Sequence, residues 1–191
     1  FSSPPLGEIR EGVIYFLFVG ALSPRKNVAR LLQAFDLFKK DAPASMKLVI
    51  VGEKMFMTSD IEDVYTKMQF KSDVIFTGRL GITDLKDVMA AAFALVFVPY
   101  YEGFGIPVLE AMYCDVPVIS SNVTSMPEVA GDAALLVDPF SVDSIKDAML
   151  KIYKDETFRN QLIVNGRKQR EKFSWDKTAE KLWGCIEKTI S

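Results

Sequence analysis

The chain contains 191 residues, of which 49% are hydrophobic and 25% charged, and it carries a net charge of −2 without any histidine. The apolar fraction excludes a disordered chain, and the excess of Asp and Glu over Lys and Arg excludes a broad basic surface for nucleic acid. The lack of histidine excludes a Ser/His/Asp triad, a histidine metal ligand and an imidazole base from within this chain. Acid–base chemistry therefore depends on carboxylates, unless another part of the protein supplies the base.

The length fits one domain of common size, which we expect over residues 13–191, with residues 1–12 as a linker. Cys114 and Cys185 are isolated in the sequence and are expected to be reduced thiols of a cytoplasmic protein. The longest apolar stretches, residues 13–21 and 90–98, reach about half the length of a membrane span. We therefore expect no transmembrane segment in this chain. No basic region precedes an apolar run near Phe1, so no signal peptide is expected.

Apolar, β-rich runs alternate with segments of helical periodicity along the chain. The first run, VIYFLFV, is continuously apolar, as is typical of a strand buried on both faces. The predicted strands are residues 13–19, 46–51, 74–76, 94–98, 116–120 and 134–137. The predicted helices are residues 26–40, 59–70, 83–91 (capped by Thr83), 107–114 and 125–130, then three helices from Ser141 onward that are broken near Asp155 and at residues 173–174.

This alternation indicates βαβ units and hence an α/β fold, a Rossmann-like doubly wound parallel sheet of about six strands flanked by helices. Ligands of such folds bind outside the carboxyl ends of the strands. The loops that follow the predicted strands are therefore the informative ones: residues 20–27, 52–58, 77–83, 99–107 and 120–127.

The first of these loops places Arg25 and Lys26 at the start of a predicted helix. A helix N-terminus favours anions through its free N–H groups and its dipole, and a guanidinium and an ammonium beside it could clamp a diphosphate. The alternative is that both side chains are solvated basic residues near a turn.

The loop of residues 99–107 combines Gly103 and Gly105, which allow close approach of backbone N–H groups to a ligand, with Glu102. Glu110 lies in the first turn of the helix predicted after it, so both carboxylates could face one crevice. Because carboxylates would repel a diphosphate, their natural partners are the hydroxyls of a vicinal diol, on a ribose or a hexose. For Glu110, placement near the helix dipole, worth about 0.3–1 kcal/mol, is the alternative explanation.

Competing nucleotide and metal motifs fail. A dinucleotide fingerprint through Gly103 and Gly105 would need glycine at position 108, where the chain has Val108. The sequence contains no GxxxxGK[ST] motif, and its cysteines do not have zinc-ligand spacing. We therefore expect no metal site.

The segment EGFGIPVLEAM (102–112) resembles the E-x7-E element of retaining glycosyltransferases, with Glu102 and Glu110 as its glutamates. Four further segments agree with that family in wording, order and spacing: VGALSPRKNVARLL (19–32), LVIVGE (48–53), VIFTGRL (74–80) and MPEVAGDAALLVDP (126–139). Phe173-Ser174-Trp175 resembles the usual start of the last helix. Nearly the whole chain thus resembles the C-terminal, nucleotide-sugar-binding domain of a glycosyltransferase family 4 (group 1) enzyme with the GT-B fold.

The resemblance implies a role for each matching position. Arg25 and Lys26 correspond to the basic pair that holds the donor diphosphate and stabilises it as the leaving group, and Glu102 to the glutamate near the transferred sugar. Glu110 corresponds to the glutamate that binds the ribose diol. Gly103, Phe104 and Gly105 correspond to the loop that cradles sugar hydroxyls and phosphate. Gly78, Arg79 and Leu80 correspond to the segment that lies against the base.

Two positions depart from the family pattern. Many members carry arginine where this chain has Ala21, and Arg25, beside Lys26, is expected to replace its charge. Asp115 stands where glycine usually ends a helix. Because aspartate tolerates a left-handed cap, only a local stability cost is expected.

The resemblance further implies a hexosyltransferase that retains anomeric configuration by front-face displacement, with UDP-, GDP- or ADP-sugar as substrate and no tightly bound cofactor. Within that family, the motif Pro-Arg-Lys-Asn favours mannose as the transferred hexose. The expected partners are an N-terminal GT-B domain, toward which the helices after about residue 158 reach, and a saccharide or lipid-linked acceptor of polysaccharide biosynthesis. The location expected is cytoplasmic, or peripheral at the inner face of the membrane in the full-length protein. The isolated domain is expected to be inactive. Two alternatives remain: a non-catalytic nucleotide-binding module, and another GT-B enzyme such as a sugar-nucleotide epimerase, although those usually need histidine.

Overall fold

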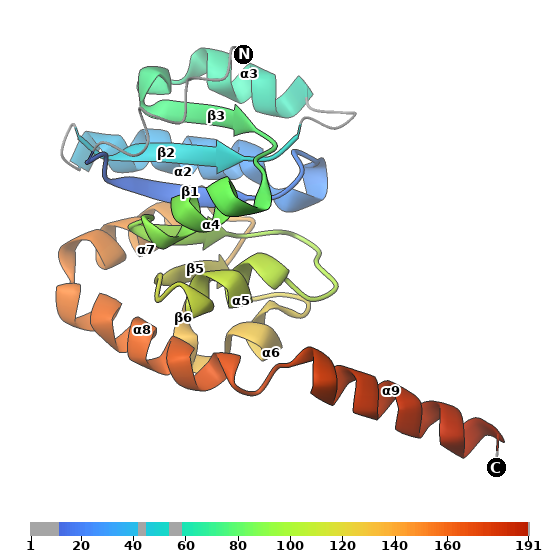
Figure 1. Ribbon diagram of the computed structural model, residues 1–191. Helices are drawn as coiled ribbons and strands as arrows, with labels where there is room; N and C mark the ends of the chain where they lie inside the picture. The colour runs from blue at the N-terminus through green and yellow to red at the C-terminus, as the bar shows by residue number, and fades with distance from the viewer. Residues whose placement is uncertain (1–11, 42–44, 54–58, 191) are drawn as a thin grey trace.

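A parallel sheet with strand order β3-β2-β1-β4-β5-β6 organises the chain in the computed structural model, which describes residues 12–41, 45–53 and 59–190 (Figure 1). The strands are β1 (Tyr15–Val19), β2 (Lys47–Val51), β3 (Val74–Gly78), β4 (Ala94–Phe97), β5 (Val118–Ser121) and β6 (Ala134–Val137). From the central pair β1 and β4, which are parallel neighbours, the chain order runs outward in both directions. This reversal confirms the predicted doubly wound sheet and places its switch point between the loops that follow β1 and β4.

Helices cover both faces of the sheet. Helix α2 packs against α3 and α7, whereas α5 packs against α4, α6 and α8; Figure 1 shows α4 and α5 in front of the sheet and α2 behind it. The α-helices are α2 (Val28–Asp41), α3 (Ser59–Lys67), α4 (Ile82–Ala90), α5 (Ile106–Tyr113), α6 (Met126–Ala130), α7 (Val142–Lys154), α8 (Glu156–Arg170) and α9 (Trp175–Ile190). Short 3-10 turns are η1 (Pro24–Lys26), η2 (Lys71–Asp73) and η3 (Gly131–Ala133).

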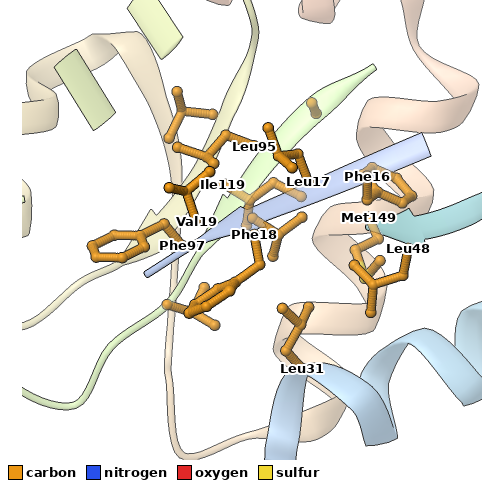
Figure 2. Close-up of a cluster of buried hydrophobic side chains, with 14 of the residues drawn as sticks. Phe16, Leu17, Phe18, Val19, Leu31, Leu48, Leu95, Phe97, Ile119 and Met149 are labelled. Atoms are coloured by element: carbon orange, nitrogen blue, oxygen red, sulfur yellow. The ribbon is translucent and has the colours of Figure 1, made fainter. Parts of the chain in front are cut away.

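The core forms where strands bury both of their faces. Every residue of β1 is buried, because helices lie on either side of this central strand. In Figure 2, Phe16 and Phe18 point toward Met149 and Leu31, which come from helices α7 and α2. The continuous apolar runs in the sequence are thus the direct consequence of a parallel sheet covered on both sides.

Several predicted boundaries need correction. The first helix begins at Val28 rather than at residue 26, because η1 and a left-handed Asn27 precede it. Thr83 is not the cap of α4: Gly81 occupies the N-cap position and Thr83 lies within the first turn. The fifth strand begins at Val118 rather than at residue 116, directly after Pro117, whose nitrogen carries no proton for the ladder.

The breaks predicted in the C-terminal region are confirmed. Helix α8 follows α7 after a single residue, Asp155, whose carboxylate accepts a hydrogen bond from Phe158 N at 2.9 Å and so caps α8. Asp115, which stands in for the usual glycine, is left-handed with φ 56°. Its carboxylate also forms two short hydrogen bonds with Arg167 (2.8 and 2.9 Å), which partly offset the cost of that conformation.

Helix α9 extends away from the rest of the domain (Figure 1). None of its residues is buried, and the exposed fractions of Trp175 and Ile190 reach 81% and 78%. Leu182 and Trp183 are also exposed, so the helix presents apolar surface to solvent. Among the described residues, no helix has both the length and the apolar character needed to cross a membrane. Apart from Gly12, the predicted linker over residues 1–12 lies outside the described part of the chain.

Candidate functional site

The switch point brings the loops after β1 and β4 together at the carboxyl edge of the sheet. The backbone N–H of Tyr100 donates to the carbonyl of Arg25 at 2.9 Å, although the two residues are 75 positions apart. In return, the Arg25 guanidinium reaches Tyr101 O at 3.4 Å. The first and fourth loops predicted to carry the chemistry are therefore joined directly.

Glu102 forms ion pairs with both predicted basic residues. The Lys26 ammonium contacts its Oε2 atom, and Arg25 Nη1 lies 3.2 Å from the same oxygen. The side chains of Lys26 and Glu102 are only 10% and 15% exposed, whereas that of Arg25 is 51% exposed, so solvent screens the arginine more strongly. The Phe97 ring lies 4.7 Å from Lys26 Nζ and completes the surroundings of the ammonium.

These contacts decide the protonation state of Glu102. Burial acts to raise the pKa of its carboxyl, but the hydrogen bond and charge of Lys26, together with the charge of Arg25, outweigh burial. The pKa therefore lies below its ordinary value of 4.5, and Glu102 is ionised at neutral pH.

Asn27 fixes the position of the basic pair, and the sequence analysis missed it. Its left-handed backbone (φ 63°) ends η1, and its buried amide nitrogen donates to Val98 O at 3.0 Å and to Pro139 O at 2.8 Å. One side chain thus holds the first loop against the ends of β4 and β6. An asparagine directly before an apolar helical stripe was the available signal.

The glycine-rich loop is held from below by the residues that start α6. Gly105 has φ 98°, and a Cβ atom built on it would lie 2.4 Å from the Cε atom of the buried Met126. Ser125 Oγ donates to the carbonyl of Glu102 at 2.8 Å. Gly103, in contrast, has open space around it. Neither Ser125 nor Met126 was singled out by the sequence analysis, because their partners lie on another strand's loop.

Glu110 lies on α5 but not where the sequence analysis placed it. The helix begins at Ile106, so Glu110 occupies the second turn rather than the first. This weakens the helix-dipole explanation, since that effect fades within the first turn. Desolvation raises the pKa of the Glu110 carboxyl above its ordinary value of 4.5. The pKa of Glu102 is thus lowered whereas that of Glu110 is raised.

The segment predicted to lie against a base ends β3, at the same edge of the sheet. Gly78 has φ 70°, and its carbonyl accepts a hydrogen bond from Gly52 N at 3.0 Å. A Cβ atom on Gly52 would lie 1.8 Å from Gly20 O, so the ends of β1, β2 and β3 approach closely through glycines. Arg79 is exposed, and Leu80 is half-buried against the core.

Within residues 12–41, 45–53 and 59–190, no group of three or more Cys, Asp or Glu side chains is arranged to hold a metal ion. The loops after β1 and β4 thus offer two cations, backbone N–H groups around glycines and the ionised Glu102 carboxylate, and Glu110 lies in the second turn of the helix that follows. Such a set can bind an anion and hydrogen-bond hydroxyl groups.

Comparisons with known proteins agree with this architecture. The family described as "Glycosyl transferases group 1" matches residues 5–169. The chain is 37% identical over 177 residues to an O-antigen chain mannosyltransferase B of Escherichia coli, covering 93% of this chain and 45% of that protein. It is 34% identical over 138 residues to the O-antigen chain mannosyltransferase RfbU of Salmonella typhimurium, covering 72% and 38% of the two chains. The chain thus spans less than half the length of these curated relatives.

Solved structures match over one half of their length. A sucrose-phosphate synthase from Thermosynechococcus elongatus superimposes with a TM-score of 0.80 at 25% identity, over 98% of this chain and 50% of that one. Anabaena HepE, solved in complex with UDP and glucose, superimposes with a TM-score of 0.83 at 19% identity, over 97% and 53% of the chains, which shows a shared fold. The chain therefore belongs to the glycosyl transferase group 1 family and corresponds to the C-terminal half of the GT-B fold.

Proposed function

We propose that this chain is the donor-binding domain of a retaining glycosyltransferase, which transfers a hexose from a nucleoside-diphosphate sugar to a saccharide or lipid-linked acceptor. The observation that carries the proposal is the meeting of Arg25, Lys26 and Glu102 beside a glycine-rich loop, at the switch point of the sheet. Ligands of doubly wound sheets bind at this point.

In this proposal Lys26 and Arg25 bind the donor diphosphate and stabilise the negative charge that develops on it as the sugar leaves. Hydrogen bonds to charged groups are worth about 1.5–3 kcal/mol, and the low exposure of Lys26 keeps its interaction from being screened. The backbone of Gly103, Phe104 and Gly105 approaches the phosphate and the sugar hydroxyls.

The two glutamates act as hydroxyl acceptors rather than as an acid–base pair. Glu102 lies nearest to the basic pair and is assigned to the transferred sugar. Glu110, one turn into α5 and partly desolvated, is assigned to the ribose diol. Residues 78–80, at the end of β3, are assigned to the base, which leaves the choice among UDP, GDP and ADP to contacts there.

The reaction as a whole needs a second half. The mannosyltransferases named above are about twice as long as this chain, and the exposed apolar face of α9 is proposed to dock on an N-terminal GT-B domain. That domain would hold the acceptor, so the isolated chain is expected to bind the donor without transferring the sugar. The names of the two mannosyltransferases support mannose as the transferred hexose. The proposed location is cytoplasmic, or peripheral at the inner face of the membrane.

Calorimetric titration of the chain with UDP, GDP and ADP tests this assignment. One of the three is expected to bind, and Lys26→Ala should weaken both the nucleotide and inorganic pyrophosphate by about ten-fold or more. Glu110→Ala should weaken the nucleotide and the nucleoside but leave pyrophosphate unchanged. Lys154→Ala and Glu156→Ala, which remove exposed charges at the end of α7 and the start of α8, are the matched controls. Failure of all three nucleotides at millimolar concentration, or an unchanged affinity in both site variants, would refute the proposal.

A further inference from the structure

The Lys26 ammonium has a resident counter-ion in this structure. With a side chain only 10% exposed and the Phe97 ring 4.7 Å away, this ammonium has little access to water. A charge so placed needs an anionic partner, because an unpaired buried charge is strongly unfavourable. Glu102 supplies that partner through its Oε2 atom.

We propose that a donor diphosphate enters the site by displacing the Glu102 carboxylate from Lys26, so that Glu102 makes the site discriminate between the intact nucleotide sugar and the free nucleoside diphosphate. The inference rests on the proposed function and concerns the regulation of that same site. It follows from charge: a carboxylate and a phosphate oxygen cannot share one ammonium at hydrogen-bond distance without repelling each other.

The displacement needs only a side-chain rotation. The Glu102 backbone is held in place, because its carbonyl accepts a hydrogen bond from Ser125 Oγ at 2.8 Å. Gly105, three residues on, packs tightly over Met126 and fixes the other end of the loop. The carboxylate can therefore move between staggered rotamers while the loop keeps its position.

The displaced carboxylate has a new partner only when a sugar is present. The hydroxyls of a hexose attached to the diphosphate can donate to Glu102 and compensate for the lost ion pair. A free nucleoside diphosphate or pyrophosphate has no such hydroxyl near the leaving oxygen, so nothing replaces the contact that Glu102 loses with Lys26. Glu102 thus weakens the binding of the product relative to that of the donor, and so favours product release.

The experiment is a calorimetric titration of the wild type and Glu102→Gln with three ligands. These are pyrophosphate, whichever of UDP, GDP and ADP binds best, and the matching nucleotide sugar. Glu102→Gln should bind pyrophosphate and the nucleoside diphosphate roughly three- to ten-fold more tightly than the wild type. The nucleotide sugar should gain less, so that the preference for donor over product falls. Glu156→Gln, the same substitution on an exposed side chain at the start of α8, should change neither affinity.

A second variant assigns the gain to the ammonium. In a Lys26→Met background, Glu102→Gln should produce a clearly smaller gain, because only the ion pair with the more exposed Arg25 is left to displace. A gain of equal size in that background would overturn the displacement. If Glu102→Gln fails to fold without its ion pair, Glu102→Asp, which keeps the charge on a shorter side chain, should give a smaller gain in the same direction.

The outcomes separate the two claims. A wild type that binds none of the ligands would overturn the proposed function. A wild type that binds, with Glu102→Gln binding product as tightly as the wild type or more weakly, would overturn the displacement alone.

Discussion

Replacement of Gly105 by alanine tests the geometry of the glycine-rich loop. The backbone of Gly105 has φ 98°, a region that costs a residue with a Cβ atom about 1–2 kcal/mol. The new Cβ atom would also lie 2.4 Å from Met126 Cε and 3.1 Å from its sulfur. Because Met126 is completely buried, it cannot swing into solvent, and overpacking of this kind costs about 1–3 kcal/mol.

The sum predicts that Gly105→Ala lowers the free energy of unfolding by about 2–5 kcal/mol, or the melting temperature by about 4–20 °C for a chain of this size. Gly103→Ala is the matched control, since no atom lies within 4 Å of its Cβ position and its φ is not positive. It should change the unfolding free energy by no more than about 0.5 kcal/mol. Calorimetry and urea unfolding followed by circular dichroism measure both variants. Equal stability of the two variants would refute the reasoning.

Two further substitutions test buried polar contacts. Tyr15→Phe removes a hydrogen bond of 2.7 Å to Val88 O and should cost about 1 kcal/mol at neutral pH. Because burial raises the pKa of Tyr15 to about 12, the wild type should lose stability as the pH rises from 10 toward 12. The variant, which has no phenol at this position, should lose less stability over the same range. Asp73→Asn replaces the carboxylate that lies 3.0 Å from the buried Lys39 ammonium by a neutral amide, and should cost about 1.5–3 kcal/mol. Burial acts to raise the pKa of the Asp73 carboxyl, but Lys47 and Lys39 outweigh burial and hold this pKa below 3.8. The stability that ionised Asp73 contributes is therefore complete above pH 3.8 and is lost as the pH falls through the folded-state pKa. The urea midpoint of Asp73→Asn should consequently change less with decreasing pH than that of the wild type.

Local periodicity was sufficient to predict the order of strands and helices. The run YFLFV of β1 has no polar position, which is what a central strand covered on both faces requires. Once the sheet was expected to be parallel, geometry alone put Arg25, Lys26 and Glu102 at one edge, because the carboxyl ends of parallel strands share that edge. The ion pairs among them agree with this expectation.

Contacts between distant loops could not be predicted. Asn27 bonds to Val98 and Pro139, which are 71 and 112 positions away, and nothing in its local sequence names these partners. The clamp of Ser125 on the Glu102 carbonyl depends likewise on how the loop after β5 meets the loop after β4. A side-chain pattern identifies an element's own faces, whereas such bonds depend on the tertiary packing of several elements.

Helix starts were the other source of error. The N-cap residue of α4, Gly81, has no side chain by which the sequence could indicate a cap, so the nearby Thr83 was wrongly predicted to be the cap. The placement of Glu110 in the first turn of α5 was wrong because the helix begins at Ile106, one residue before Pro107. The sequence analysis also expected Glu102 to face only sugar hydroxyls, and it did not foresee that the carboxylate would be turned onto Lys26.

The central claim is that the carboxyl edge between β1 and β4 binds the diphosphate of a nucleotide sugar. A crystal structure of the chain with whichever of UDP, GDP and ADP binds best tests it most directly. The account predicts phosphate oxygens within hydrogen-bond distance of Lys26 Nζ and ribose hydroxyls at the Glu110 carboxylate. A nucleotide bound at the opposite, amino edge of the sheet, or one at this edge with Lys26 still paired to Glu102 and without contact to phosphate, would contradict it.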